Sequence, residues 1–221
     1  MSESPRYDGM AEWYDAFVRS ADHTPVVLDV LERLLGRGPG SCLDLGCGTG
    51  IAFPVLARLE WSIVGVDMST DQLAVASAYA DSLGVQLLAG DASRLPFAAD
   101  SFDAVISLLT HTDFDHLGAA FRETARVLRP GGRFVYVGVH PCFASSVVDR
   151  RADGPPVLLP GYRRHGRDTG AVGEVRERVG VNHVPLAELL NAVLAAGIRL
   201  EQIEEPKGDD YPLLLAMQGS R

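Results

Sequence analysis

The sequence predicts an α/β fold: a mainly parallel, seven-stranded sheet with helices on both faces. Short apolar runs alternate with segments in which apolar residues recur at helical spacing, and a glycine-rich turn follows the first apolar run. Such alternation places successive strands in one sheet and packs the connecting helices on its faces. The expected strands are 41–45, 62–66, 85–89, 103–109, 132–138, 198–203 and 211–217.

Helices are expected before and between these strands. The first, over 25–35, would begin with Thr24 as the capping residue and Pro25 in the first turn. Apolar residues at helical spacing mark three further helical faces. They are Leu73, Ala76, Ala80 and Leu83; then Leu117, Phe121, Ala125 and Leu128; then Leu186, Leu189, Leu190, Val193 and Leu194.

The turn after the first strand has the composition of a ligand-binding loop. Gly46, Gly48 and Gly50 allow a sharp turn into a helix and let backbone amides lie against a ligand. The helix N-terminus behind them favours a carboxylate or a phosphate. Asp67 ends the next apolar run, 21 residues after Gly46, and a carboxylate there can accept both hydroxyls of a ribose.

The glycine spacing disfavours a dinucleotide as the ligand. In this G-x-G-x-G pattern the third glycine comes one residue earlier than in the dinucleotide fingerprint. Asp44 adds a negative charge that would repel a phosphate and attract an ammonium group. A ligand that combines adenine, ribose and a zwitterionic amino-acid tail fits better.

Four motifs resemble, in order and spacing, those of the class I S-adenosylmethionine-dependent methyltransferases. They are LDLGCGTG at 43–50, VD at 66–67, GDASRLPFAADSFD at 90–103 and RVLRPGGRFVYV at 126–137. The resemblance covers residues 41–140 strongly. It implies a Rossmann-like sheet whose last strand, 211–217, runs antiparallel at or near the edge. It also implies S-adenosylmethionine as the cofactor and S-adenosylhomocysteine as its product.

The resemblance further assigns the cofactor-binding residues. Asp44 and the glycine-rich turn would hold the methionine part, Asp67 the ribose hydroxyls and Met68 one face of adenine. The turn residues are Gly46, Cys47, Gly48 and Gly50. Asp91, with Ala92 beside it, would accept from the adenine amino group, and Ser107 and Leu108 would line the methyl end. Tyr14, in the segment 7–17, would cover the sulfonium, and Tyr7 and Trp13 are weaker candidates for that role.

One domain over residues 1–221 is expected, because this length lies within the range of a single α/β domain. Its parts would be an N-terminal helical cover at 1–36, the cofactor-binding core at 41–140, a substrate lid at 141–184 and a C-terminal helix and strands at 185–221. The lid shows no convincing helix, and structureless segments of that length are usually functional or disordered. Within it, residues 173–181 alternate like one strand of a small hairpin.

The lid is rich in arginine although the chain is acidic. An anionic acceptor would explain this, and a solvated surface loop explains it equally well. The arginines are Arg150, Arg151, Arg163, Arg164, Arg167, Arg176 and Arg178.

A hydroxyl acceptor that must lose its proton would need a general base. His111 follows the fourth expected strand and His140 the fifth, where active sites of open α/β sheets form. Either histidine could instead orient the substrate or cap a loop. His183 is expected to cap or pack.

No metal ion is expected. HTDFDH at 111–116 contains the ligand types His111, Asp113, Asp115 and His116, but its spacing matches no metal motif. Asp115 is explained as the cap of the following helix. The three cysteines, at 42, 47 and 142, form neither a zinc nor a disulfide pattern.

The composition narrows the partners. A formal net charge of −9 and a sequence pI near 5.1 disfavour nucleic acid, which is held by basic surfaces. The chain start lacks a leader-like pattern, and no run approaches the ~18 apolar residues of a membrane span, so we expect no membrane partner and a cytoplasmic enzyme. The oligomeric state stays open.

The predicted function is methyl transfer from S-adenosylmethionine to a small molecule, with oxygen slightly ahead of nitrogen or carbon. The first alternative is a protein that binds the same cofactor but transfers no methyl, either a binding module or a cyclisation catalyst. The second is a nicotinamide-dependent oxidoreductase, whose glycine fingerprint is absent.

Overall fold

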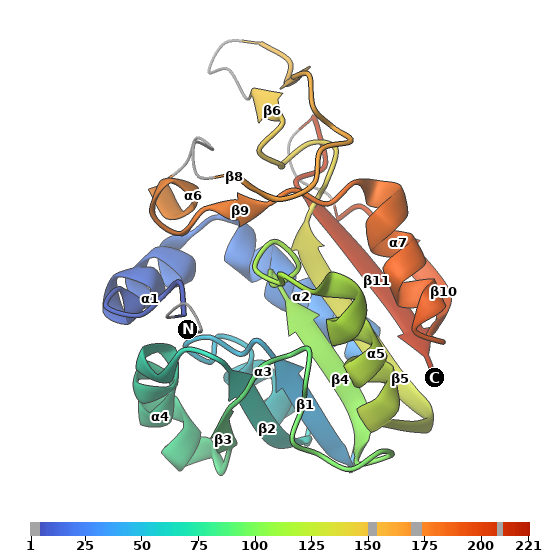
Figure 1. Ribbon diagram of the computed structural model, residues 1–221. Helices are drawn as coiled ribbons and strands as arrows, with labels where there is room; N and C mark the ends of the chain where they lie inside the picture. The colour runs from blue at the N-terminus through green and yellow to red at the C-terminus, as the bar shows by residue number, and fades with distance from the viewer. Residues whose placement is uncertain (1–4, 150–153, 169–173, 207–209) are drawn as a thin grey trace.

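The computed structural model describes residues 5–149, 154–168, 174–206 and 210–221. A seven-stranded sheet runs through the molecule in the order β10-β11-β5-β4-β1-β2-β3 (Figure 1). Strand β11 is antiparallel to both of its neighbours, and the other pairs are parallel. The strands are β1 Ser41–Leu45, β2 Ser62–Asp67, β3 Gln86–Ala89, β4 Phe102–Leu108, β5 Leu128–Val139, β10 Arg199–Glu204 and β11 Leu214–Ser220.

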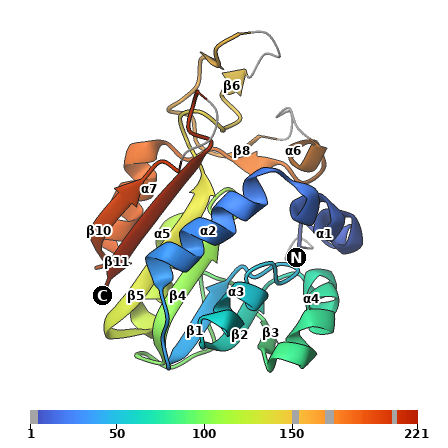
Figure 2. The same cartoon turned by 180° about the vertical axis from the view of Figure 1, so that it is seen from behind.

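Helices cover both faces of this sheet, as Figures 1 and 2 show from opposite sides. Helices α2, α3 and α4 pack on one face, and α5 and α7 pack on the other. The helix α1 lies above the carboxyl ends of the strands. The helices are α1 Ala11–Ser20, α2 His23–Leu35, α3 Phe53–Arg58, α4 Thr70–Leu83, α5 Leu117–Val127, α6 Glu174–Val179 and α7 Leu186–Ala195.

Alternate residues of the central strands feed two separate cores. On β4, Ala104 and Ile106 face the α2 side, whereas Val105 faces α5. Because side chains of a strand point alternately to opposite faces, a strand buried on both faces must be apolar throughout. This explains the continuous apolar runs and confirms the Rossmann-like fold with its antiparallel last strand.

Three details differ from the sequence-based expectations. The last strand is β11, at Leu214–Ser220 rather than 211–217, although its place one strand in from the edge, between β5 and β10, agrees with the expectation. The first long helix begins at His23, so Thr24 lies inside it and donates its hydroxyl to the Val18 carbonyl instead of capping. Val18 belongs to the preceding helix α1, so the Thr24 hydrogen bond is a contact between two helices that the local sequence pattern does not predict.

The third difference lies in the segment after β5. The expected strand over 173–181 is wrong: its described part forms the helix α6, followed by the short strand β9, Val181–Asn182. The other strands of this segment are β6 Val148–Asp149, β7 Val157–Leu158 and β8 Arg167–Asp168. They pair as β6 with β7 and β8 with β9. Arg150 and Arg151 lie outside the described residues.

No described helix has both the length and the apolar character needed to cross a membrane.

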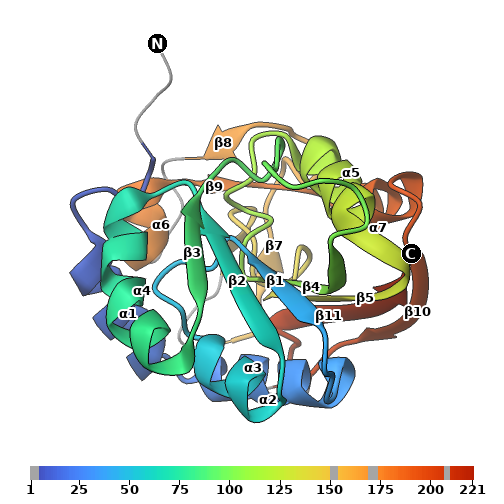
Figure 3. The same cartoon turned by 90° about the horizontal axis from the view of Figure 1, so that it is seen from below.

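Figure 3, which views the molecule from below, shows the parallel strands side by side with the helices around them. The carboxyl ends of β1, β2 and β4 therefore meet at one edge of the sheet, beneath the N-terminal segment and the segment after β5.

Candidate active site

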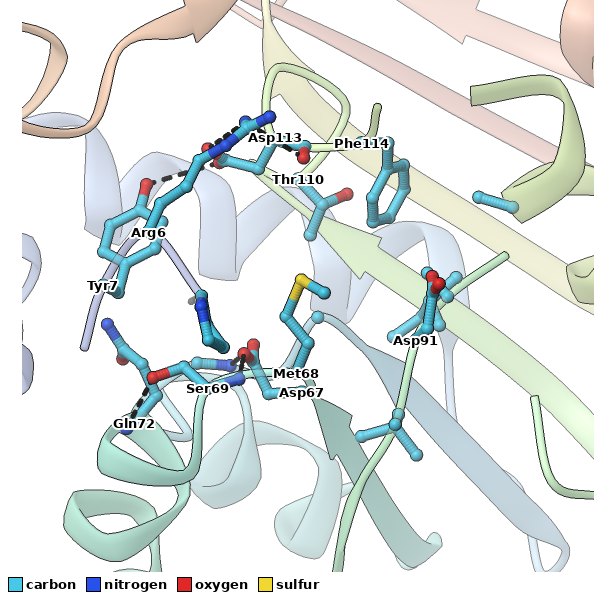
Figure 4. Close-up of a pocket in the computed structure, with 18 of the residues that line it drawn as sticks. Arg6, Tyr7, Asp67, Met68, Ser69, Gln72, Asp91, Thr110, Asp113 and Phe114 are labelled. Atoms are coloured by element: carbon cyan, nitrogen blue, oxygen red, sulfur yellow. Dashed lines mark hydrogen bonds and ion pairs between the residues drawn. The ribbon is translucent and has the colours of Figure 1, made fainter. Parts of the chain in front are cut away.

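A pocket of about 420 Å³ lies at the carboxyl ends of the central strands (Figure 4). Its floor comes from the ends of β1, β2 and β4 and from the turns that follow them. The N-terminal residues Pro5–Tyr7 and Tyr14 of α1 form part of its cover. Of the sequence-predicted cofactor residues, it brings together Tyr14, Gly46, Gly48, Asp67, Met68, Asp91, Ala92 and Leu108.

The turn after β1 requires glycine at two positions. Gly46 has φ +71°, and a Cβ there would come within 2.6 Å of the Thr110 side chain. Gly50 has φ +81°, and a Cβ there would lie 2.4 Å from the Phe53 ring. Since L residues rarely adopt such φ values, the turn is closed to other side chains. Gly50 shapes the turn but does not line the pocket.

Asp67 is held by backbone amides. Its Oδ2 accepts a hydrogen bond from Gly48 N at 2.9 Å, and its Oδ1 accepts one from Ser69 N at 2.9 Å. Burial raises the pKa of this carboxyl, and the backbone hydrogen bonds act in the opposite direction. Each oxygen keeps acceptor capacity for a further donor. The carboxylate is thus fixed in place at the pocket wall before any ligand binds.

Asp44 lies in a narrower recess that adjoins the main pocket. Tyr14, Gly46, Cys47 and Gly48 line the same recess. The side chain of Asp44 is buried. Burial, together with the nearby Asp67, raises the pKa of Asp44 to about 7. A cationic group bound here would offset that cost.

The other end of the pocket carries the residues expected at adenine. Met68 is exposed, and its side chain extends into the pocket in Figure 4. Asp91 lies across from it, and Asp91 Oδ1 accepts a hydrogen bond from Ser93 N at 2.8 Å. Ala92 lines the wall beside Asp91. This end therefore offers an apolar face next to a carboxylate that its own loop holds in place.

The end of β4 differs from the expectation for one residue. Leu108 lines the pocket, but Ser107 is fully buried and its hydroxyl hydrogen-bonds to that of Thr110. Thr110 is the residue that reaches the pocket. Ser107 therefore supports the wall from behind, because the strand period points it to the opposite side.

Sequence reasoning missed several lining residues. Arg6 reaches across the cover to the loop after β4, where it pairs with both Asp113 and Asp115 (Figure 4). Gln72, in the first turn of α4, has both amide atoms buried without a hydrogen-bond partner in the described part of the chain. Phe114 adds an aromatic wall. The acids in HTDFDH, placed directly after a buried strand, were the available signal for this loop.

His111 does not line the pocket. It is buried, and its Nδ1 lies 2.6 Å from the hydroxyl of Tyr136. Burial, with smaller contributions from Arg176 and His183, lowers the pKa of His111 to about 3. A neutral imidazole with such a pKa is a weak base. Its proposed catalytic role stays a prediction that this geometry disfavours.

His140 is also buried away from the pocket. Its Nε2 lies 2.9 Å from Glu205, and its Nδ1 accepts a hydrogen bond from Cys142 N at 3.1 Å. Both ring nitrogens are engaged, which favours the loop-capping interpretation. His183 Nε2 contacts the Tyr162 carbonyl at 2.7 Å, in line with a packing role.

The lid arginines among the described residues do not line the pocket. Arg167 bonds to the Val179 carbonyl, Arg176 to the Ala144 carbonyl, and Arg178 stacks over Trp13. Their roles here are to tie the lid together and to the N-terminal helix. Asp115 is not a helix cap, since His116 occupies that position and Asp115 instead pairs with Arg6 and Asn182.

The described residues contain no group of three or more His, Cys, Asp or Glu side chains that could hold a metal ion. They do fit a ligand with a ribose and a positive charge. Five carboxyls line the pocket or its recess, those of Asp44, Asp67, Asp91, Asp113 and Asp115, and glycines bring backbone close to it. The buried Gln72 amide without a partner is a further unmet site for hydrogen bonds.

Comparison with known proteins decides what kind of domain this is. Residues 43–136 match the family described as methyltransferase domain. These residues form a class I methyltransferase domain. Its cofactor is S-adenosylmethionine. The match spans the strands β1 to β5, whose carboxyl ends build the pocket.

Relatives and solved structures agree with this assignment. The domain is similar to a demethylmenaquinone methyltransferase of Mycolicibacterium paratuberculosis, 37% identical over 145 residues, which are 61% of this chain and 60% of that protein. A second protein of that name, from a Mycobacterium species (strain KMS), is 41% identical over 137 residues, 57% of each chain. The chain thus spans about three fifths of the length of these relatives.

Two solved structures share the fold. An S-adenosylmethionine-dependent methyltransferase from Mesorhizobium loti superposes with a TM-score of 0.75 at 24% identity, covering 92% of this chain and 100% of that one. The cyclase SpnF superposes with a TM-score of 0.59 at 28% identity, covering 89% of this chain and 62% of that one. The methyltransferase scaffold therefore also occurs in a protein named for a different reaction.

Proposed function

We propose that this chain transfers a methyl group from S-adenosylmethionine to a small-molecule acceptor, with oxygen ahead of nitrogen and carbon as the atom methylated. The observation that carries the proposal is the joint placement of Asp44 and Asp67. One acid is buried in a recess beside the glycine-rich turn, and the other is fixed by backbone amides at the wall of the same pocket.

Each wall of the pocket then has a task. Asp67 would accept the ribose hydroxyls, Asp44 and the turn would hold the amino-acid part, and Met68 would lie against adenine. Asp91 and Ala92 would bound the adenine edge, and Leu108 and Tyr14 would close the methyl end. The bound cofactor supplies an activated methyl group. The protein contributes mainly by holding the acceptor in line with it.

The charges around the pocket favour an uncharged acceptor. Arg6 is the cation on the described wall, and it is already shared between Asp113 and Asp115. The lid arginines lie elsewhere, so an anionic acceptor gains no support from them. The name shared by the two relatives above directs the first probe to a reduced quinone, 1,4-naphthohydroquinone, which is neutral and offers both hydroxyl oxygens and ring carbons to a methyl donor.

Calorimetry and mass spectrometry test the proposal. Purified protein is titrated with S-adenosylmethionine and with S-adenosylhomocysteine, and then incubated with S-adenosylmethionine and 1,4-naphthohydroquinone, catechol or histamine. We expect heat of binding for both cofactor forms, and S-adenosylhomocysteine with a methylated oxygen product. Absence of binding heat would reject the proposal. Methylation of histamine alone would move the acceptor atom from oxygen to nitrogen.

A second candidate keeps the cofactor and transfers no methyl. The 28% identity to the cyclase SpnF is the observation that favours it. The same pocket would then hold an intact cofactor while another molecule reacts beside it. Binding heat without any S-adenosylhomocysteine across the acceptor panel would support this candidate.

A further inference from the structure

The loop after β4 places a carboxylate at the wall of the pocket. Asp113 follows a turn closed by a hydrogen bond from its own N–H to the Thr110 carbonyl, 2.8 Å long. Its side chain is 27% exposed and lines the pocket. Figure 4 shows it above Met68, on the opposite side from Asp67. Asp113 lies in the loop after β4 and lines the same pocket as Leu108 and Thr110.

Two residues of the N-terminal segment hold this carboxylate. Tyr7 donates its hydroxyl to Asp113 Oδ2 at 3.3 Å, and Arg6 Nη1 lies 3.6 Å from Oδ1. Arg6 also donates to the Asp113 backbone carbonyl at 3.1 Å. Asp113 is therefore oriented by side chains more than 100 residues away in the sequence.

We infer that Asp113 is the catalytic residue that accepts the proton of the acceptor hydroxyl, and that Arg6 and Tyr7 are its positioning residues. The inference rests on the proposed function. It replaces His111 in that role, because Asp113 lines the pocket and His111 does not.

The proton and electrons balance in one displacement. The acceptor O–H bond breaks and its proton moves to a carboxylate oxygen of Asp113. The acceptor oxygen forms a bond to the methyl carbon as the carbon–sulfur bond breaks, and that electron pair stays on sulfur. Asp113 then returns its proton to water when the product leaves.

The surroundings of Asp113 suit a base. Burial raises its pKa to about 7, while Arg6, the Tyr7 hydroxyl and Arg167 of β8 act to lower it and Asp67 acts to raise it. A carboxylate with a raised pKa holds a proton more strongly than an ordinary aspartate, and it is still ionised in part at neutral pH. Arg6 and Tyr7 supply the interactions that keep the ionised form available.

A purely structural role for Asp113 would be to anchor the N-terminal segment. That segment has other anchors, because Gly9 N donates to Asp71 Oδ2 at 2.7 Å and the Ser69 hydroxyl lies 2.7 Å from Asp8 Oδ1. Arg6 also keeps Asp115 as a partner. Loss of the Asp113 charge should therefore leave the segment in place.

The test compares Asp113→Asn with a control, Asp81→Asn, which removes an exposed carboxyl on α4 that does not line the pocket. Cofactor affinity is measured by calorimetry, and kcat against pH with 1,4-naphthohydroquinone. For Asp113→Asn we expect kcat to fall at least about 100-fold, with the pH-dependent rise near neutrality lost. Affinity for S-adenosylhomocysteine should stay within about threefold for both variants, and Asp81→Asn should keep kcat within about twofold.

A second readout needs no turnover. The wild-type complex with S-adenosylhomocysteine is studied by ¹³C NMR of labelled aspartate, and the carboxyl signal missing in Asp113→Asn is assigned to Asp113. This signal should titrate clearly above the range of an ordinary aspartate. Retained kcat in Asp113→Asn, or an ordinary titration, would overturn the inference and leave the proposed function standing. Absence of cofactor binding in the wild type would instead overturn the proposed function, and this inference with it.

Discussion

Two carboxylates face each other across the pocket and are held in different ways. Asp67, at the end of β2, accepts hydrogen bonds from two backbone amides of adjoining turns. Asp113, after β4, is held by the side chains of Arg6 and Tyr7. Backbone amides are set by the fold itself, whereas two long side chains from an N-terminal segment can adjust.

This difference matches two kinds of task. A group that binds a ribose works best when it is rigid before the ligand arrives, since ordering then costs little. A group that takes up a proton must change its charge, and its partners must tolerate both states. The manner in which each acid is held therefore supports the proposed division between an acid that binds and an acid that reacts.

The largest expected effect sharpens the binding half of the comparison. Asp67→Ala should weaken S-adenosylmethionine binding by about 1–3 kcal/mol, because ribose hydroxyls lose a charged acceptor. Calorimetry measures the change, and Asp81→Ala on the exposed face of α4 is the matched control. Unchanged affinity in Asp67→Ala would break the assignment of this acid to the ribose.

The turn that supports Asp67 should be nearly as sensitive. Gly46→Ala should lower the free energy of unfolding by about 2 kcal/mol, because the new Cβ meets Thr110 and the residue has φ +71°. Gly84→Ala is the control, since Gly84 has φ +67° but open space around it, and it should cost about 1 kcal/mol. Urea denaturation measures both. Equal losses would show that the contact with Thr110 contributes nothing.

The pH dependence of cofactor binding tests the buried charges. Burial and the nearby Asp67 raise the pKa of Asp44 to about 7, so in the free protein its protonated form stabilises the fold, and this stabilisation is lost as the pH rises through 7. A cationic ligand favours the ionised form, so affinity should rise between pH 6 and pH 7.5, by about fivefold to tenfold per such group.

Calorimetry in two buffers of different ionisation enthalpy would record the protons released. Asp44→Asn removes this group and should flatten the pH dependence, leaving the part that comes from Asp113. A variant with an undiminished pH dependence would contradict the placement of the cofactor's positive charge near Asp44.

The smallest effect sharpens the reacting half of the comparison. Tyr7→Phe removes the hydroxyl that donates to Asp113 Oδ2 and should raise the pKa of that carboxyl further, by about 0.3–0.7 unit, because a long hydrogen bond is worth about 0.5–1 kcal/mol. The kcat–pH profile should move to higher pH by the same amount. A profile that stays in place would mean that Tyr7 covers the pocket without positioning Asp113.

Much of the cofactor half of the site was predictable because it is local. Each of the predicted features lies at the end of an apolar run: the turn from Gly46 to Gly50, Asp67 and Asp91. Because parallel strands end at the same edge of a sheet, these features come together there. Ser107 and Leu108 were both expected at the pocket, but neighbouring residues of a strand point to opposite faces. Leu108 lines the pocket, and Ser107 is buried behind it.

The acceptor half was not predictable in the same way. His111 has the residue type of a base, yet it folds inward against Tyr136. Asp115 was expected to cap a helix and Asp113 was considered only as a candidate metal ligand, whereas both pair with Arg6 of the N-terminal segment. Residues 173–181 alternate like a strand, but Glu174–Val179 form the helix α6, whose Arg178 stacks over Trp13 of α1.

The sequence alone determined the parallel sheet, its two-sided cover of helices, and the turn and acids that line the pocket, because strand period, helix period and glycine spacing act over neighbouring residues. Only the tertiary structure decided that Arg6 pairs with Asp113 and Asp115, that His111 and His140 are buried away from the pocket, and where the last strand inserts. Those outcomes depend on contacts between segments far apart in the chain, and side-chain burial there sets the charge states that local patterns leave open.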